Sequence, residues 1–157
     1  MENVFADDYD QTQDKSGFRW DRMRLAQRLG GEMLGASVYV LPPGEKSFPY
    51  HLHRANEELL LVLDGQVQLR TPTGTNTMNT GDAALFRRGE EGAHQVINSS
   101  EAPARFIMFS TMVSPEVAQY PDSGNIGVLD WSPGGSEEDR FVRFLDGSAE
   151  RDYFEGA

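Results

Sequence analysis

The three histidines of this chain are the residues whose spacing suggests chemistry. His51 and His53 occupy alternate positions of the sequence HLH, and on an extended strand such positions face the same side. Two imidazoles on one side can bind a single cation at about 2.0–2.2 Å. Glu58 follows closely and offers a carboxylate, and His94 begins a second strand-like segment, HQVIN. The sequence therefore predicts a site for one divalent metal ion, held by His51, His53, Glu58 and His94.

The composition limits both the metal and the partners. The chain has no cysteine, which excludes disulfides and thiolate metal sites. Imidazole and carboxylate ligands suit first-row divalent ions, here manganese, iron, nickel or zinc. The net charge of −11 repels phosphate backbones and anionic lipid. We therefore expect a small-molecule ligand or substrate, no nucleic-acid partner and no membrane partner.

The same composition bears on where the protein works. No apolar run approaches the roughly 20 residues needed to cross a bilayer. The first residues, MENVFADDYD, lack the basic and apolar regions of a signal peptide. A chain without cysteine suits a reducing compartment. We expect a cytoplasmic protein.

Most of the chain between residues 36 and 112 resembles a series of short β-strands. Residues 36–41 are rich in β-formers and end at Pro42-Pro43-Gly44. The apolar run LLLVL is followed by Asp64-Gly65 and then by QVQLR, a pattern typical of a β-hairpin. Turns recurring about every 8–12 residues indicate a β-sandwich or a barrel. Residues 20–35 fit either a helix or a strand, and we favour a strand.

The run LLLVL is apolar at both strand parities, which predicts burial on both faces. One face would line the barrel. The other would be covered either by a partner subunit, which favours a homodimer, or by the chain's own terminal segments.

The two ends of the chain differ from its middle. Residues 1–17 are polar and acidic, which predicts a loose arm or a segment that covers a sheet edge. Residues 113–157 are expected to be irregular, with enough apolar mass to pack back on the barrel: Trp131, Phe141, Phe144, Tyr153 and Phe154. We expect a single domain, residues 1–157, with a barrel core at about residues 36–112.

Two segments resemble the sequence motifs of the cupin superfamily. Residues 44–65 match the order glycine, His-x-His, glutamate and glycine, and residues 81–98 match the order glycine, glycine, histidine and asparagine. The resemblance implies an all-β double-stranded β-helix, a jelly-roll barrel with the metal inside one mouth, here with irregular terminal segments. It also selects Glu58 over Glu57, because the motif places six residues between the glutamate and Gly65. Glu57 has the opposite strand parity.

The second motif departs from the family pattern near His94. Arg87 replaces a proline, and four residues rather than two separate Gly89 from His94. The longer loop would shift His94 along its strand. Arg87 and Arg88 would form either an anion clamp for a substrate or a surface loop with ion pairs, and we favour the surface loop.

Three histidines and one carboxylate leave about two positions of an octahedral metal for water or substrate. Such an open site suits an isomerase, epimerase or lyase acting on a small polar or sugar-like substrate, which is the class we favour. The alternatives are an Fe(II)-dependent dioxygenase and a non-catalytic, metal-dependent binding protein. The sequence identifies no catalytic residue. Candidates for acid–base chemistry, none at a diagnostic spacing, are Glu45, Lys46, Tyr50, Tyr120 and Tyr153.

Overall fold

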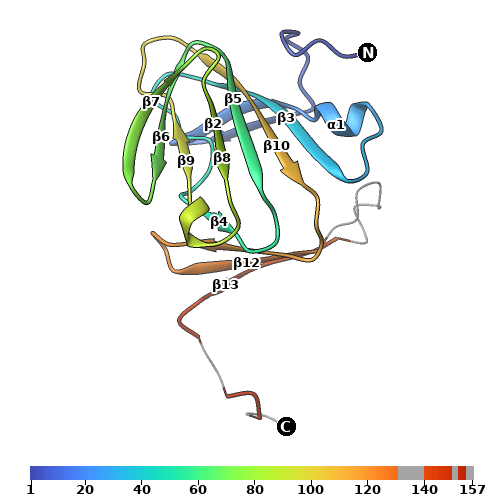
Figure 1. Ribbon diagram of the computed structural model, residues 1–157, viewed down its shortest axis with the longest axis vertical. Helices are drawn as coiled ribbons and strands as arrows, with labels where there is room; N and C mark the ends of the chain where they lie inside the picture. The colour runs from blue at the N-terminus through green and yellow to red at the C-terminus, as the bar shows by residue number, and fades with distance from the viewer. Residues whose placement is uncertain (131–139, 150–151, 155–157) are drawn as a thin grey trace.

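The computed structural model describes residues 1–130, 140–149 and 152–154, which fold into antiparallel sheets rolled around a common core (Figure 1). The elements in chain order are β1 (Gln11–Lys15), β2 (Phe18–Met23), α1 (Leu25–Arg28), β3 (Leu34–Leu41), β4 (Leu52–His53), β5 (Glu58–Asp64), β6 (Gln66–Thr71), β7 (Gly74–Asn79), β8 (Ala83–Phe86), the 3-10 helix η1 (Glu90–Gly92), β9 (Gln95–Ile97), β10 (Ala104–Thr111), β11 (Glu116–Tyr120), β12 (Asn125–Asp130) and β13 (Phe141–Asp146).

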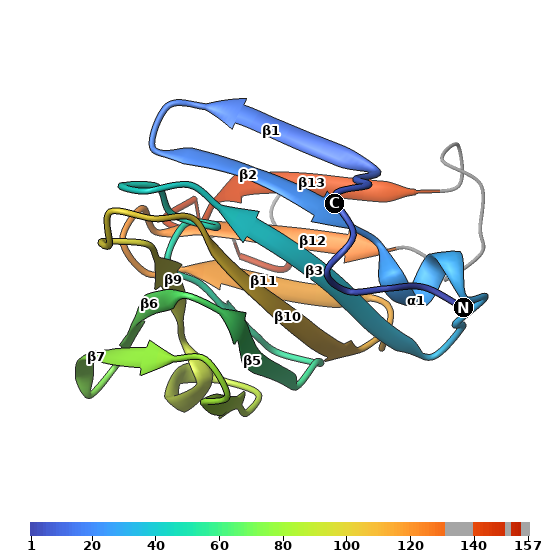
Figure 2. The same cartoon turned by 90° about the horizontal axis from the view of Figure 1, so that it is seen from above.

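The described strands form three sheets, and every pairing within them is antiparallel. The largest sheet has the order β1-β2-β3-β10-β5-β8, the second β13-β12-β11-β4 and the third β7-β6-β9. Figure 2 shows β2, β3 and β10 side by side, with β11, β12 and β13 as a separate layer behind them. This layer is the one that carries part of the histidine cluster, because β4 is its edge strand.

The barrel interior is filled by apolar side chains that alternate along the strands. On β5, Leu60 and Val62 point inward and are 0% and 1% exposed. They join side chains from the largest and the smallest sheet in one cluster, whose buried members also include Trp20, Tyr39, Leu41, Val67, Leu69, Met78, Phe86, Val96, Ala104 and Phe106. Burial of this apolar area supplies the main driving force for closing the barrel.

The outer face of β5 is covered largely by the chain itself. Leu61 and Leu63 pack against a second apolar cluster, to which Val4 and Ala6 of the N-terminal segment also contribute. Leu59 is 36% exposed. Of the run LLLVL, the inner residues Leu60 and Val62 are buried, whereas on the outer face Leu61 and Leu63 are partly buried by the chain itself and Leu59 is exposed.

The hairpin predicted at Asp64-Gly65 is wrong. β5 pairs with β10 and β8, whereas β6 pairs with β7 and β9. Gly65 has a φ of 78°, and a Cβ there would lie 3.0 Å from the carbonyl oxygen of Pro103. This glycine turns the chain from the large sheet into the small one, so the turn signal marks a corner and not a hairpin.

Residues 20–35 contain both a strand and a helix, the two structures considered for this segment. The favoured strand is present as β2, which ends at Met23, but residues 25–28 form the short helix α1. Among the described residues, no helix combines the length and the apolar character that crossing a membrane requires.

Both terminal segments are more regular than predicted. Within residues 1–17, β1 pairs with β2 at the edge of the large sheet, so this segment covers an edge. Residues 116–130 contain β11 and β12, and residues 141–146 form β13, so the expectation of an irregular C-terminal segment is wrong in these two ranges. The predicted aromatic packing is wrong for three residues, which are 48–91% exposed: Phe141, Tyr153 and Phe154. Phe144 is 60% exposed, but its ring lies 5.9 Å from the ring of Tyr120. Trp131 lies outside the described residues.

Candidate metal centre

Backbone pairing brings the two histidine segments together. His51 and His94 form an isolated antiparallel bridge. Each donates its backbone N–H to the carbonyl oxygen of the other, at 3.2 and 2.8 Å. The ring centroid of His51 lies 4.6 Å from that of His94 and 5.0 Å from that of His53. The structure thus places all three imidazoles in one cluster.

Glu58 completes the cluster from the first position of β5. Its Oε2 atom lies 3.3 Å from Nε2 of His53 and 3.2 Å from Nε2 of His94. His51, His53 and Glu58 each offer a ligand atom within 4.8 Å of the others, and His94 joins this triple through Glu58. Glu57 is exposed and lines a different surface.

Backbone carbonyls orient two of the three rings. Nδ1 of His51 lies 2.8 Å from the carbonyl oxygen of Pro49, and Nδ1 of His94 lies 2.9 Å from that of Gly92. A carbonyl oxygen only accepts, so both rings donate from Nδ1. The Nε2 lone pair of each ring is then free to bind a cation.

The surroundings of the His53 ring indicate whether a cation fits the site. Both of its ring nitrogens are buried, and neither has a hydrogen-bond partner among the described residues. Nε2 faces Glu58 at 3.3 Å, and Nδ1 faces Oε2 of Glu116 at 3.6 Å. A buried polar atom without a partner destabilises a fold, and a cation at Nε2 would satisfy it. Three imidazoles and one carboxylate therefore fit a first-row divalent ion.

The charges of the cluster are set by burial and by the neighbouring groups. Burial, followed by the charges of His94 and His53, lowers the pKa of His51 to about 3. Burial also lowers the pKa of His53, but the Glu116 and Glu58 carboxylates have the larger, opposite effect and raise this pKa to about 9. Burial would raise the pKa of Glu58, yet its contacts with His53 and His94 hold it well below its usual range. At neutral pH, His51 is uncharged and Glu58 is ionised.

The long loop before His94 does not displace that residue. The helix η1 takes up the additional residues, and the ring of Phe86 stacks on the His94 ring with centroids 3.8 Å apart. Gly92 lies so close to the preceding turn that a Cβ would come within 1.7 Å of the carbonyl oxygen of Arg87. The expected shift of His94 along its strand is therefore absent.

The sequence analysis missed Glu116 and named Tyr120 only as one of five acid–base candidates. Both lie on β11, which pairs with β4 so that Ala118 is opposite His53. Glu116 is 1% exposed, and the ring of Tyr120 stacks on His51 with centroids 6.0 Å apart. No sequence signal marked Glu116, because a buried carboxylate interrupts the apolar alternation by which strands are recognised.

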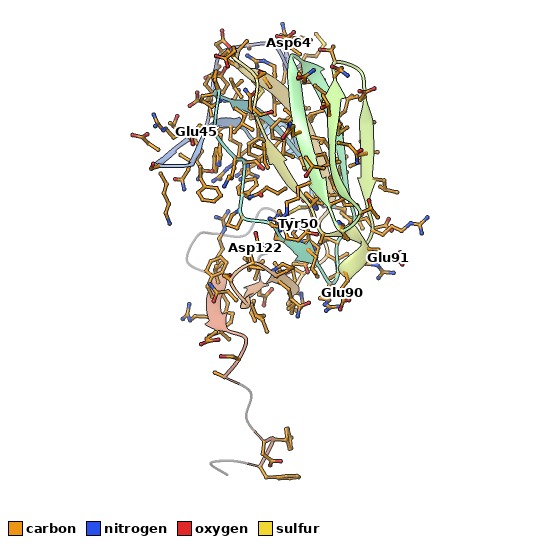
Figure 3. The ribbon with its side chains drawn as sticks, turned by 90° about the vertical axis from the view of Figure 1, so that its left-hand side faces the viewer. Glu45, Tyr50, Asp64, Glu90, Glu91 and Asp122 are labelled. Atoms are coloured by element: carbon orange, nitrogen blue, oxygen red, sulfur yellow. The ribbon has the colours of Figure 1, made fainter. Side chains whose placement is uncertain are left out.

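The other acid–base candidates have contacts elsewhere. Arg70 lies 4.0 Å above the Tyr50 ring and pairs with Asp122, and Figure 3 shows Tyr50 and Asp122 close together. Glu45 pairs with Arg19 at 3.1 Å. Lys46 lies over the Phe18 ring, and Tyr153 is 91% exposed. Of the five candidates, Tyr120 is the one for which the described residues show a ring contact with the histidine cluster.

Arg87 and Arg88 line a separate surface pocket of about 370 Å³, together with Arg54, Glu57 and Gly89. Arg54 directly follows β4 and Glu57 directly precedes β5, and both are exposed. The pocket is also lined by the acidic residue Glu57, and Glu90 pairs with Arg54 at 3.7 Å. Figure 3 shows Glu90 and Glu91 at the outer edge of the molecule. This placement does not support an anion clamp over the histidine cluster.

Comparison with known proteins agrees with the motifs. Residues 37–110 match the family model of the cupin domain. A germin-like protein 9-2 of Oryza sativa subsp. japonica is 31% identical over 98 residues, which are 59% of this chain and 44% of that protein. The chain thus matches less than half the length of that relative.

Solved structures share the fold. A cupin-superfamily protein of Silicibacter pomeroyi, named a sugar phosphate isomerase, is 26% identical to this chain. Its TM-score is 0.73, and the match covers 89% of this chain and 83% of that one. A protein of Acidithiobacillus ferrooxidans named for the same activity is 22% identical, with a TM-score of 0.73 over 87% of this chain and 81% of that one. The motifs, the antiparallel barrel and these matches agree, and the chain contains a cupin domain with the all-β cupin fold.

Proposed function

We propose that this chain binds one divalent transition-metal ion through His51, His53, Glu58 and His94. The observation that carries the proposal is the position of Glu58, whose Oε2 lies within 3.3 Å of Nε2 in both His53 and His94. The carbonyl partners at Nδ1 leave Nε2 of His51 and His94 as acceptor atoms. Manganese, iron, nickel and zinc all suit this donor set.

We further propose that the site acts on a small polar or sugar-like substrate as a metal-dependent isomerase, epimerase or lyase. The cluster lies near the surface, since the side chains of His53 and Glu58 are 17% and 14% exposed. A structural neighbour of 26% identity is named a sugar phosphate isomerase, which supports the substrate class. A bound metal would polarise a carbonyl or hydroxyl oxygen of such a substrate.

Tyr120 is the residue of this chain best placed to assist a bound substrate. Its ring stacks on His51, and burial raises the pKa of its phenol. The phenol therefore keeps its proton at neutral pH. It would donate a hydrogen bond to a substrate oxygen rather than act as the base.

The metal proposal is tested by elemental analysis of the purified protein and of four variants: His51→Ala, His53→Ala, Glu58→Gln and His94→Ala. We expect about one ion per chain in the unaltered protein and a marked loss in each variant. Glu57→Gln is the matched control, because this neighbouring carboxylate is exposed and lines the other face. Full metal content in both His51→Ala and His53→Ala would refute the site.

The same samples address the reaction class. The melting temperature should fall together with metal content, because ligand at 100 times its Kd stabilises a fold by about 2.7 kcal/mol. Bound iron, with oxygen uptake in the presence of substrate, would favour a dioxygenase instead. Stabilisation by a ligand without turnover would favour a binding protein.

We also propose that the protein is a homodimer, formed through the part of the LLLVL strand that the chain itself leaves exposed. Leu59 and Leu85 are cross-strand neighbours on β5 and β8, and they are 36% and 58% exposed. They form an apolar patch at the edge of the large sheet that a second copy would cover. The expected cytoplasmic location remains a prediction.

A further inference from the structure

Glu116 is a fully buried carboxylate that follows the segment matched by the cupin domain. It is the first residue of β11, and its side chain is 1% exposed. Ionised side chains are rarely buried to this extent unless they are paired. The partners of Glu116 therefore indicate what the residue does.

One carboxylate oxygen of Glu116 is held by the backbone. Its Oε1 atom accepts the N–H of Arg54 at 2.9 Å and the N–H of Ala55 at 3.1 Å. The side-chain amide of Asn56 donates to Oε2. Three donors from consecutive residues fix the orientation of the carboxylate directly beyond His53.

The second oxygen also faces His53. Oε2 lies 3.6 Å from Nδ1 of that ring, and no described residue forms a hydrogen bond with this nitrogen. The other two rings of the cluster direct Nδ1 to a backbone carbonyl at 2.8 and 2.9 Å. At His53, the Glu116 carboxylate occupies the place that a carbonyl takes at His51 and His94.

We propose that Glu116 is a positioning residue that accepts a hydrogen bond from Nδ1–H of His53 and so directs Nε2 toward the metal. This inference rests on the proposed metal site. A carboxylate in this position fixes the tautomer and the orientation of the ring and makes its other nitrogen a stronger ligand. A strand that follows the cupin-matched segment thereby completes the metal centre.

A purely structural role for Glu116 makes a different prediction. Glu116 also ties down residues 54–56, so its loss would loosen that loop in either case. Asn56 anchors the same loop through Val113, whose N–H it accepts at 2.7 Å and whose carbonyl it contacts at 3.0 Å. Asn56→Ala therefore weakens the loop and removes one of the three donors, but the backbone N–H groups of Arg54 and Ala55 still hold Oε1 and keep the carboxylate opposite His53.

The test compares the affinity of metal-free protein for Mn²⁺ in four chains: unaltered, Glu116→Gln, Asn56→Ala and Glu45→Gln. We expect Glu116→Gln to weaken binding about 10- to 100-fold, as removal of such outer partners typically does. Asn56→Ala should lower the melting temperature but change the affinity less than threefold, about 0.65 kcal/mol at 1.36 kcal/mol per tenfold. Glu45→Gln removes a buried carboxylate that pairs with Arg19, away from the cluster, and is the matched control.

Unchanged affinity in Glu116→Gln, with binding by the unaltered protein intact, would overturn the positioning role alone. Failure of the unaltered protein to bind Mn²⁺, Zn²⁺ or any of the other proposed ions would instead refute the metal site itself. The two failures are thus distinguishable.

A measurement on the unaltered protein covers the case in which Glu116→Gln does not fold. Nitrogen NMR of the Zn²⁺-loaded chain reports which ring nitrogen of His53 carries the proton. We expect a protonated Nδ1 with slow exchange, as for a hydrogen bond to a buried acceptor. A protonated Nε2, or a rapidly exchanging Nδ1 proton, would overturn the proposal.

Discussion

The rings of Phe86 and His94 stack with their centroids 3.8 Å apart and an angle of 8° between their planes. Phe86 is 4% exposed and closes β8, where it lies opposite Glu58 in the β5–β8 register. One core side chain thus contacts one proposed ligand and neighbours another. The barrel core holds His94 and Glu58 in place before any ion binds, which reduces the cost of ordering them.

Replacing Phe86 by leucine should affect both the fold and the metal centre. The change removes the aromatic stack, worth about 0.5–1.5 kcal/mol, and some buried area, so the metal-free protein should melt at a lower temperature. His94 would also lose the ring that fixes its plane, so Mn²⁺ affinity should fall. Leu69→Ala, a core change on β6, is the control. If Leu69→Ala weakens Mn²⁺ binding as much as Phe86→Leu does, the stack has no special role at the site.

Gly92→Ala should be strongly destabilising. A Cβ at this position would lie 1.7 Å from the carbonyl oxygen of Arg87, so the loop must move. Overpacking typically costs about 1–3 kcal/mol, and this contact is with backbone, which cannot rotate away. The carbonyl of Gly92 also accepts from Nδ1 of His94, so metal affinity should fall with stability.

Chemical denaturation of the metal-free protein measures the first effect of Gly92→Ala, and a metal titration measures the second. Glu91→Ala, at an exposed neighbouring position, should change stability by less than about 0.5 kcal/mol. A Gly92→Ala protein as stable as the unaltered one would show that the loop accommodates a side chain.

Metal affinity should rise with pH between about 7 and 9. The pKa of His53 in the metal-free protein is raised to about 9, so at neutral pH both ring nitrogens are protonated and the ring is charged. A cation and a proton compete for Nε2, and raising the pH removes the proton. Affinity should therefore increase about tenfold per pH unit and level off above pH 9, with one proton released per ion. Calorimetry of Mn²⁺ binding in two buffers of different ionisation enthalpy counts that proton, and zero release at pH 7 would contradict the prediction.

The same shift affects the stability of the metal-free fold with the opposite sign. The folded pKa of His53 lies above its ordinary value of 6.5, so the folded state holds the proton more tightly. This contribution is fully present below pH 6.5 and is lost as the pH rises through about 9. In His53→Gln that loss should disappear from the pH profile of the melting temperature.

The clustering of His51, His53 and Glu58 could be predicted because it depends on local geometry. Alternation along a strand places His51 and His53 on one side, and parity separates Glu58 from Glu57. These features need only a few consecutive residues. The position of His94 was harder, because the η1 turn that absorbs the longer loop depends on the close approach of Gly92 to Arg87.

Glu116 and the sheet that carries it could not be predicted in the same way. β11 reaches β4 by pairing between distant parts of the chain, which leaves no periodic signal near either strand. The inward positions of β11 hold Glu116, Ala118 and Tyr120, a series without apolar alternation. Likewise Asp64-Gly65 is a turn signal in isolation, but only the competing partners of β5 and β6 show that it is a corner.

The exposed pair Leu59 and Leu85 leads to the last prediction, a dimer in solution. Full burial of a leucine side chain contributes about 1.5–3 kcal/mol relative to exposure, and a two-fold interface would bury the pair from both copies. Light scattering at micromolar concentration should therefore give twice the mass of the chain, and Leu85→Glu should shift it to a monomer. Thr77→Glu, at an exposed position on β7 in the small sheet, should leave the dimer intact. A monomeric unaltered protein would mean that the cover provided by Val4, Ala6 and α1 is sufficient for this face of the sheet.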